Sequence, residues 1–553
     1  MGEEPARRVR YRGRVYAARP SEPLLTAISA RGIPILERSV RYHRPRAPFC
    51  GTGQCTGCLV RVNGRPLVRS CRYRPHDGDV VVSDGGWPSA RLDLLGLLDV
   101  LFPGGLDPFR GFRRPAFAAP VYQWFVRRLA GYGTLPPPGS PAPPAPAVAR
   151  RADVVVVGGG ASGRAVLDRL ATLGHRPLLI DRDPLASAPA GTDLLPGVSV
   201  TLLTPPDPSR ERPFALVGFM DDGPGVAVEA RTVVVATGGY DASLSFPGND
   251  RPGVLTADAA LGLAPSQERT WFRHAALIGG DRRAVEVLAA HGARIGSVVA
   301  TGEVRPDVVR AASDLGIPIY PRSLIVGVRG RRRVRALRLQ GRGRGPPFSL
   351  RCDAVLLAHR RLPNVQLAYL AGARMRWCAG PGAYLPEVDE RGRTSVPGLF
   401  AAGEAAGVLP VDAAASGERV AEAIAGGGWE GAPALAGVRE DGAGDLEGYY
   451  RELLAVPRRG RWVACRCEDV LLEDLARAHA AGYRGIEVIK RYTSLGTGLC
   501  QGRYCVPDAL LLLAVLENRP PHEVGFVRSR PPVFPTPLGA LASLDGPART
   551  EVP

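Results

Sequence analysis

A strand, a glycine turn and a helix follow one another directly in the stretch "DVVVVGGGASGRAVLDRL", which begins at Asp153. Four consecutive valines are typical of a strand that is buried on both faces of a parallel sheet. Gly158, Gly160 and Gly163 then form G-x-G-x-x-G at the start of the helix, and Asp181 ends the next strand. Such a turn needs glycine because the backbone must approach a pyrophosphate at the helix N-terminus, while the acid binds a ribose hydroxyl. The stretch therefore predicts a parallel α/β domain that binds a dinucleotide.

Two later segments favour FAD over NAD as that dinucleotide. Thr237 and Gly238 lie in "VVVATGG", which predicts a strand followed by a turn. Gly403 and Glu404 lie in "GLFAAGEAAG", where the glutamate is placed to reach the ribityl or phosphate region of a flavin. An ordinary packed α/β turn, and NAD at the same site, remain the alternatives.

A second strand-turn-helix unit starts at His274 with "HAALIGGDRRAVEVLAAHG". Asp281 stands where the middle glycine of the turn belongs, and Ala284 stands at the third position. An aspartate there repels a pyrophosphate and blocks the close approach of its backbone. We therefore expect a retained fold with weak or lost NAD(P) binding, although Arg282 and Arg283 offer charges for a phosphate group.

The N-terminal region carries a cysteine loop, "FCGTGQCTGC", with the spacing C-x4-C-x2-C-x12-C. Its cysteines are Cys50, Cys55, Cys58 and Cys71. This is the plant-type [2Fe-2S] pattern, in which four thiolates hold two irons. Gly51, Gly53 and Gly57 suit a compact loop that needs positive φ angles and bare N–H groups close to sulfur. A structural zinc site and unligated thiols are the alternatives.

A second group of cysteines lies near the C-terminus, in "CRCEDV" and "CQGRYC". Its members are Cys465, Cys467, Cys500 and Cys505, spaced C-x-C-x32-C-x4-C. The intervening "EDLARAHAAGY" predicts a helix, so the two pairs can converge in one small helical module. We expect a second [2Fe-2S] cluster, with zinc or free thiols as alternatives. Cys352 and Cys378 stand alone and are expected in the core.

Composition limits the classes of partner. The 553 residues suggest three or four domains, and 71 basic against 53 acidic residues give a formal charge of +18. Lys490 is the only lysine, so the excess is scattered arginine, and we read it as a coding bias rather than a nucleic-acid surface. No signal peptide and no apolar run of roughly 18 residues is present, which predicts a cytoplasmic protein without a transmembrane segment. Because thiols are kept reduced in the cytoplasm, the ten cysteines indicate metal or redox chemistry rather than disulfides.

These features predict a multidomain α/β and α+β chain. A β-grasp ferredoxin-like domain precedes a doubly wound flavoprotein core of two dinucleotide-binding domains, and a small helical iron–sulfur domain follows. The predicted boundaries are 1–90 for the ferredoxin-like domain, 91–148 for a helical connector with a proline-rich linker, 149–270 and 363–430 for the FAD domain, 271–362 for the degenerate second domain, 455–510 for the C-terminal [2Fe-2S] domain, and 511–553 for a tail.

The order of these parts resembles the alpha subunit of heterotetrameric sarcosine oxidase and its relatives among dye-linked proline and hydroxyproline dehydrogenases, opine oxidases and hydrogen cyanide synthase. The resemblance covers most of the chain. It includes "YHRPRAPFCGTGQC", "DPFRGFRRPAFAAPVYQWFVRRLAG", "VVVVGGGASG", "GLFAAGE", "CRCED", "CQGRYC" and "RPPVFPTPLGALA". The four C-terminal cysteines also resemble those of bacterioferritin-associated ferredoxin, whose last pair is more closely spaced.

The resemblance implies a subunit that works beside a smaller FAD-dependent flavoprotein, which dehydrogenates the amine. Family members differ in whether this subunit binds FAD, NAD or ATP, and an FMN shared with the partner is a further expectation. The aminomethyltransferase region of the sarcosine enzyme is expected to be absent, and tetrahydrofolate chemistry with it.

The sequence therefore predicts an electron-transfer subunit of an amine or imino-acid oxidising complex, acting on sarcosine, proline, hydroxyproline or opines and passing electrons to an acceptor. No residue is assigned a catalytic role, because the histidines are isolated, and His43 beside the first cysteine loop is expected to shape that loop or contact a partner. One rival is a self-contained NAD(P)H-dependent ferredoxin or disulfide reductase. Another is a non-catalytic zinc or nucleic-acid-binding protein.

Overall fold

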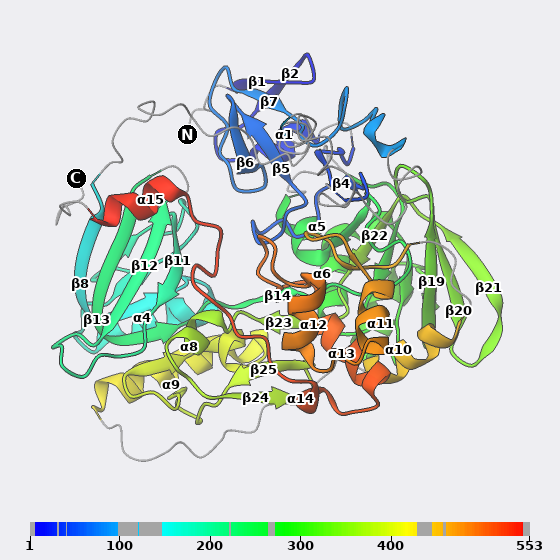
Figure 1. Cartoon of the computed structure of the whole chain (residues 1–553). Coiled ribbons are helices and arrows are strands. Elements are labelled where there is room, and N and C mark those ends of the chain that lie inside the picture. Colours follow the sequence, from blue (N-terminus) through cyan, green and yellow to red (C-terminus); the bar gives the residue numbers. More distant parts are fainter. Residues whose placement is uncertain are drawn as a thin grey trace. The chain divides into compact units, whose positions relative to one another are not determined.

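The chain forms two compact units, which are described separately (Figure 1). The computed structural model describes residues 6–29, 32–39, 41–97, 120, 146–220, 223–263, 271–427, 445–456 and 461–545. The first unit combines residues 1–136, 241–360 and 444–525, and the second combines 137–240, 361–443 and 526–553. Most of the predicted connector, at 98–119 and 121–145, lies outside the described residues.

The N-terminal part of the first unit is a mixed sheet with one helix. The sheet order is β2-β1-β7-β5-β6, in which β1 and β7 are parallel and the other neighbours antiparallel. The strands are β1 (Arg7–Tyr11), β2 (Arg14–Ala18), β5 (Leu59–Val62), β6 (Arg65–Arg69) and β7 (Val80–Val82). Every residue of α1 (Leu24–Ile28) is buried against them. A short ladder, β3 (Glu37–Arg38) with β4 (Pro45–Arg46), leads into the cysteine loop.

The middle part of the first unit is a parallel sheet ordered β15-β22-β16-β17-β18. Its strands are β15 (Val254–Thr256), β16 (Ala275–Ile278), β17 (Ile295–Val299), β18 (Ile319–Tyr320) and β22 (Ala354–Leu357). Three helices follow strands of this sheet, namely α5 (Ala257–Leu263), α6 (Arg282–His291) and α7 (Pro306–Asp314). An antiparallel sheet, β19 (Ser323–Arg329), β20 (Ala336–Gly341) and β21 (Arg344–Arg351), is inserted before β22.

This sheet corrects one predicted boundary. The sequence analysis assigned 241–270 to the FAD domain, but β15 pairs in parallel with β22 of the second dinucleotide-type sheet. Leu255, Ala257 and Ala260 are fully buried in the hydrophobic core of the first unit. The chain passes between the units at 240/241 and again at 360/361, close to β14 (Gly239–Asp241) and β23 (Arg361–Pro363).

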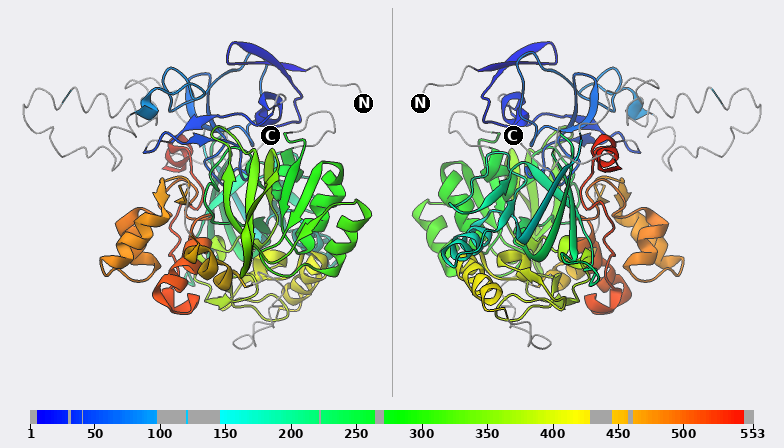
Figure 2. Two further views of the ribbon diagram at one scale, coloured as in Figure 1. Left: turned by 90° about the vertical axis from the view of Figure 1, so that its right-hand side faces the viewer. Right: turned by 90° about the vertical axis from the view of Figure 1, so that its left-hand side faces the viewer.

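The C-terminal part of the first unit is a helical module, shown in orange in Figure 2. It contains α10 (Leu446–Ala455), β27 (Val463–Cys465), β28 (Val470–Leu471), α11 (Leu472–Ala480), α12 (Ile486–Thr493), α13 (Val506–Glu517) and α14 (Pro521–Val524). Seven consecutive residues of α13, from Asp508 to Ala514, are buried. The prediction that a tail begins at 511 is therefore wrong, because 511–517 complete the central helix of this module.

The second unit contains the first glycine turn. Its sheet is ordered β10-β9-β8-β13-β12-β11, with β26 on β13. The strands are β8 (Val148–Val157), β9 (Leu178–Ile180), β10 (Asp193–Leu195), β11 (Val198–Leu203), β12 (Phe214–Met220), β13 (Gly225–Val235) and β26 (Leu399–Ala401). The helix α4 (Ala161–Thr172) packs against α9 (Ala413–Ala425). Smaller elements are α8 (Gln366–Leu370), β24 (Met375–Cys378), β25 (Ala383–Pro386) and α15 (Leu538–Ala542).

The parallel strands β8, β9, β10, β13 and β26 explain why this region folds as the sequence predicts. Val155, Val156, Val233 and Val234 are fully buried, as expected for strands covered on both faces. Among the helices that the structure describes, none is both long and apolar enough to cross a membrane.

Candidate iron–sulfur and dinucleotide sites

The first cysteine quartet lies on the loop between β4 and β5 and just after β6, and all four thiols are buried. The side chains form two pairs within hydrogen-bonding distance, Cys50 with Cys55 and Cys58 with Cys71. Burial alone would raise the pKa of Cys50, but the Cys55 thiol and two backbone amides lower it to about 5. The loop thus favours a thiolate, the form that ligates iron, at Cys50, whereas the contact with Cys50 and burial raise the pKa of Cys55.

Backbone N–H groups of this loop approach the sulfur atoms, as the sequence analysis expected. Gly57 donates its N–H to Cys55 Sγ at 3.3 Å. Gly51 and Gly53 have φ angles of 67° and 75°, in the left-handed region. Gly57 has no such φ angle, but it stands where a bulkier residue would clash, as expected. It is constrained by space instead, because a Cβ there would lie 2.4 Å from the carbonyl oxygen of Ala47.

The second quartet closes into a ring of neighbouring thiols, although its pairs come from distant parts of the module. Cys467 and Cys500 have their sulfur atoms 3.1 Å apart. Cys465 is within hydrogen-bonding distance of both Cys467 and Cys505, and Cys500 is also near Cys505. The loop is tight here too, since a Cβ on Gly498 would lie 2.7 Å from Cys467 Cβ.

The pairing of the thiols in the first quartet fits a two-iron group. All ten cysteines are free thiols. Among the described residues, no three His, Cys, Asp or Glu side chains are set around a single point as ligands of one ion. A [2Fe-2S] cluster takes two thiolates on each iron, and the thiols paired as Cys50–Cys55 and Cys58–Cys71 meet that demand. Cys352 and Cys378 are buried core residues, and burial raises the pKa of Cys352 to about 12.

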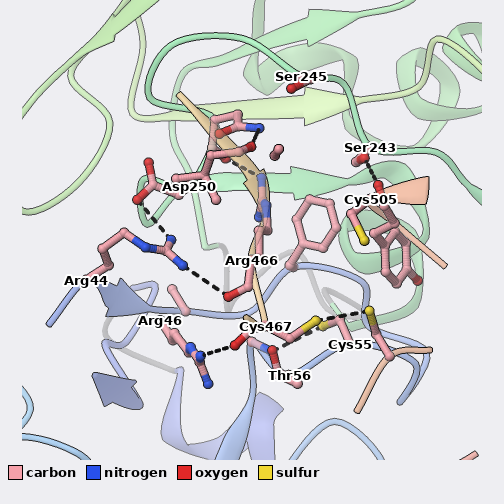
Figure 3. Close-up of a pocket in the computed structure, with 18 of the residues that line it drawn as sticks. Arg44, Arg46, Cys55, Thr56, Ser243, Ser245, Asp250, Arg466, Cys467 and Cys505 are labelled. Atoms are coloured by element: carbon pink, nitrogen blue, oxygen red, sulfur yellow. Dashed lines mark hydrogen bonds and ion pairs between the residues drawn. The ribbon is translucent and has the colours of Figure 1, made fainter. Parts of the chain in front are cut away.

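The two quartets line the same pocket of the first unit, which the sequence did not reveal (Figure 3). Cys55 lines it from the N-terminal loop, and Cys467, Cys500 and Cys505 line it from the helical module. The rings of Phe49 and Tyr504 meet edge to face across it, with centroids 5.2 Å apart. The two predicted cluster modules therefore line one pocket, although more than 400 residues of chain separate Cys55 from Cys467.

Arginines hold the two cysteine loops together. Arg44 is buried, and it bonds Asp250 at 3.1 Å, the side chain of Asp469 and the carbonyl of Arg466 at 3.0 Å. Burial alone would lower the pKa of Arg44, but Asp469 and Asp250 outweigh it and raise the pKa. His43, which the sequence placed beside the first loop, bonds Asp93 at 2.9 Å.

The glycine turn of the second unit has the geometry of a dinucleotide site. Gly158 has a φ of 105°, and Gly160 is the N-cap of α4. A Cβ on Gly163 would lie only 1.9 Å from the Gly158 carbonyl oxygen, whereas a Cβ on Gly160 would meet nothing within 4 Å. Asp181 follows β9, and its Oδ2 accepts the N–H of Gly159 at 2.6 Å. The structure brings the three predicted glycines and the predicted acid together.

The other predicted residues of this unit lie at two neighbouring turns. Thr237 Oγ1 donates to the carbonyl of Asn364 at 2.8 Å, and Asn364 Nδ2 donates back to the Thr237 carbonyl at 3.0 Å. Gly238 and Gly403 both have a φ of 62°. Glu404 lies near Gly238, and its two oxygens bind Arg361 in a bidentate ion pair. Asn364 and Arg361 were not predicted, because nothing local in the sequence links them to these turns.

The degenerate turn of the first unit is closed by its own side chains. Asp281 caps α6 by accepting the N–H of Arg283 at 3.0 Å, which puts a carboxylate at the helix N-terminus. Burial raises its pKa to about 6. We expected Arg283 to offer its charge to a phosphate group. Its guanidinium instead pairs with Asp241, Asp258 and Glu286. Arg282 is exposed.

Three family models match consecutive parts of this architecture. A 2Fe-2S iron–sulfur cluster binding domain matches residues 8–86, a pyridine nucleotide-disulphide oxidoreductase domain matches 211–427, and a sarcosine oxidase A3 domain matches 459–544. The fold and these domains define an iron–sulfur flavoprotein of the oxidoreductase class, with a [2Fe-2S] cluster and FAD as its cofactors.

The chain is also similar to known oxidase subunits. The sarcosine oxidase alpha subunit of Rhizobium meliloti (strain 1021) is 26% identical over 577 aligned positions, covering 96% of this chain and 57% of that relative. The A-type subunit of opine oxidase from Agrobacterium tumefaciens (strain Ach5) is 25% identical, covering 72% of this chain and 92% of that one. The crystal structure of L-proline dehydrogenase from P. horikoshii shares the fold, with a TM-score of 0.64, 18% identity and 97% coverage of both chains. The chain is similar to sarcosine oxidase alpha subunits and to their opine oxidase counterparts over most of its length, and the predicted resemblance is confirmed.

Proposed function

We propose that this chain is the electron-transfer subunit of an amine or imino-acid dehydrogenase or oxidase complex. One observation carries the proposal: two thiol quartets, each of a form suited to a two-iron cluster, line one pocket of a chain that also contains a flavoprotein domain. Oxidation of an amine delivers two electrons at once, and iron–sulfur clusters supply one-electron steps. A chain with both kinds of site is suited to convert between the two.

Each cofactor has proposed ligands. The first [2Fe-2S] cluster is held by Cys50, Cys55, Cys58 and Cys71, and the second by Cys465, Cys467, Cys500 and Cys505. FAD lies on the turn of Gly158, Gly160 and Gly163, with its pyrophosphate at the N-terminus of α4 and a ribose near Asp181. Thr237, Gly238, Gly403 and Glu404 complete that site, and Arg361 fixes the Glu404 carboxylate. NAD or ATP in the same site is the alternative occupant.

The substrate-oxidising chemistry is placed on a partner. We propose a smaller FAD-dependent subunit that oxidises sarcosine, proline, hydroxyproline or an opine, with an FMN shared between the two chains and an electron acceptor beyond them. The named relatives are subunits of such oxidases, which favours this role over a self-contained NAD(P)H-dependent reductase. Ten free thiols suit a reducing compartment, and we place the complex in the cytoplasm.

Anaerobic purification with iron, sulfide and flavin analysis tests the cofactor inventory. We expect about four irons per chain, from two clusters of two, together with one FAD. The variant Cys55→Ser should lower the iron content to about two while keeping the flavin, because Cys55 and the glycine turn belong to different units. Loss of flavin in that variant would contradict the assignment of separate sites.

Turnover assays test the division of labour. The purified chain, loaded with its cofactors, should not reduce a dye with any of the four substrate types. Co-expression with the smaller flavoprotein partner should restore dye reduction. Robust turnover by the single chain, shown to be free of other subunits, would overturn the proposed role.

A further inference from the structure

Arg466 lies between two proposed ligands of the second cluster, but its side chain is directed to the first cysteine loop. Its guanidinium carbon lies 3.7 Å from the centroid of the Phe49 ring, one residue before Cys50. It also donates to the carbonyl of Asn249. Figure 3 shows the side chain within the pocket that both quartets line.

The charge of Arg466 lacks a carboxylate partner within the part of the chain that the structure describes. No salt bridge within 4.0 Å joins it to a described Asp or Glu. Its neighbour Arg44 differs, because Asp250 and Asp469 both bind that guanidinium. Removing a cation from water is costly unless an anion compensates it. The electrostatic field of Arg466 acts first on Asp250 and then on the Cys55 sulfur. Because Asp250 is already bound by Arg44, an anion at the first quartet would complete the compensation.

Arg46 reaches in the opposite direction, from the first cysteine loop to the second. It belongs to β4, just before the first cysteine loop, and donates to the carbonyl oxygen of Cys467 at 2.8 Å, as Figure 3 shows. Its field reaches the Cys467 sulfur. Arg46 also pairs with Glu37 at 3.1 Å, so part of its charge is neutralised. Each cysteine loop therefore supplies an arginine to the other.

A cluster held by four thiolates is anionic, and reduction adds one further negative charge. A nearby cation stabilises the reduced form more than the oxidised form, and so raises the reduction potential. On this basis, and resting on the two clusters of the proposed function, we propose that Arg466 raises the reduction potential of the first cluster and Arg46 that of the second. Through these two arginines, each cysteine loop affects the reduction potential of the cluster on the other loop. Arg466 has no carboxylate in an ion pair with it among the described residues, so it has the larger effect.

Redox titration of the whole chain, monitored by electron paramagnetic resonance, tests whether each arginine raises the reduction potential of the other loop's cluster. The signals are assigned first with Cys55→Ser, which removes one cluster, and Cys500→Ser, which removes the other. In Arg466→Gln we expect the first cluster to be at least tenfold harder to reduce, about 59 mV for one electron. In Arg46→Gln the second cluster should shift in the same direction by less.

Two further variants control for simple structural damage. Arg466→Lys keeps the charge and should keep the first cluster close to its wild-type potential. Arg477→Gln removes an exposed arginine of α11 that pairs with Asp474 and does not line the pocket, so it should shift neither signal. If Arg466→Gln fails to retain its clusters, Arg46→Gln still tests the proposal at the second cluster, where an unmoved potential would overturn it.

The outcomes separate this proposal from the proposed function. If the wild type holds two clusters and Arg466→Gln leaves their reduction potentials unchanged, the proposed effect of the arginines is overturned, but the proposed function is not. The same holds if the first cluster shifts equally in Arg466→Lys. A shift confined to the second cluster in Arg466→Gln would also overturn the proposed effect. A wild-type chain with fewer than two clusters would overturn both proposals.

Discussion

The two glycine turns of this chain share a fold and differ in what they can hold. In the second unit, Gly158, Gly160 and Gly163 leave the N-terminus of α4 open. In the first unit, the same strand-turn-helix arrangement presents Asp281 at the N-terminus of α6, where its carboxylate already bonds the helix N–H. The sheets beneath both turns are equally well buried. The comparison shows that a buried core preserves the fold at both turns, and we expect the side chain at the turn to decide whether an anion can bind.

Among substitutions at the two turns, Gly163→Val should have the largest effect on flavin binding and stability. Its Cβ would fall 1.9 Å from the Gly158 carbonyl oxygen, and overpacking at such a site costs ~3 kcal/mol or more. We expect the flavin to be lost and the unfolding midpoint of the second unit to fall. Absorbance of the purified flavin and thermal unfolding measure both. The matched control is Ala284→Gly at the equivalent position of the other turn, which should leave the flavin in place.

Gly160→Ala should separate binding from folding. The added methyl group would meet no protein atom within 4 Å, so the stability of the apoprotein should not change. It would stand where the pyrophosphate must approach, and we expect FAD to bind at least tenfold more weakly, about 1.4 kcal/mol. Titration of the apoprotein with FAD measures the affinity. Unchanged affinity would argue that the pyrophosphate does not lie on this turn.

Asp281 should keep reduced nicotinamide nucleotides out of the first unit. We expect NADH and NADPH at micromolar concentration to bleach the flavin poorly, because the carboxylate repels phosphate at the helix N-terminus. Asp281→Gly removes that charge and should raise the affinity for either nucleotide about tenfold, as measured by calorimetry. Rapid bleaching of the wild-type flavin would contradict the difference between the two turns.

Asp281 should also give a small dependence of stability on pH. Burial raises its pKa to about 6, above the value of about 3.9 in an unfolded chain. The folded state therefore holds the proton more tightly, and this stabilisation is complete below about pH 4 and lost as pH rises through about 6. Asp281→Asn keeps a capping oxygen without titrating. The variant should gain ~1 kcal/mol relative to wild type between pH 4 and pH 7 in urea unfolding, and parallel curves would disprove the effect.

The sequence was sufficient wherever a function depends on local spacing. The cysteine intervals and the G-x-G-x-x-G turn are short patterns, and their residues lie together as predicted. Contacts between distant segments leave no such pattern. Arg46 and Cys467 are 421 residues apart, and the Glu404–Arg361 pair joins two turns that look unrelated in the sequence. The strand at 254–256 was assigned to the wrong sheet for the same reason, since three apolar residues do not specify their neighbour.

The first unit is formed by three separate segments of the chain, which are synthesised at different times. Cys71 leaves the ribosome more than 400 residues before Cys505, an interval of roughly 20–90 s at ordinary rates of translation. During that time the N-terminal thiols are present, but the pocket wall formed by residues 463–508 does not yet exist. A cluster inserted into the nascent chain enters a half-built site without Arg466, whereas a cluster inserted after release enters one that already carries its charge.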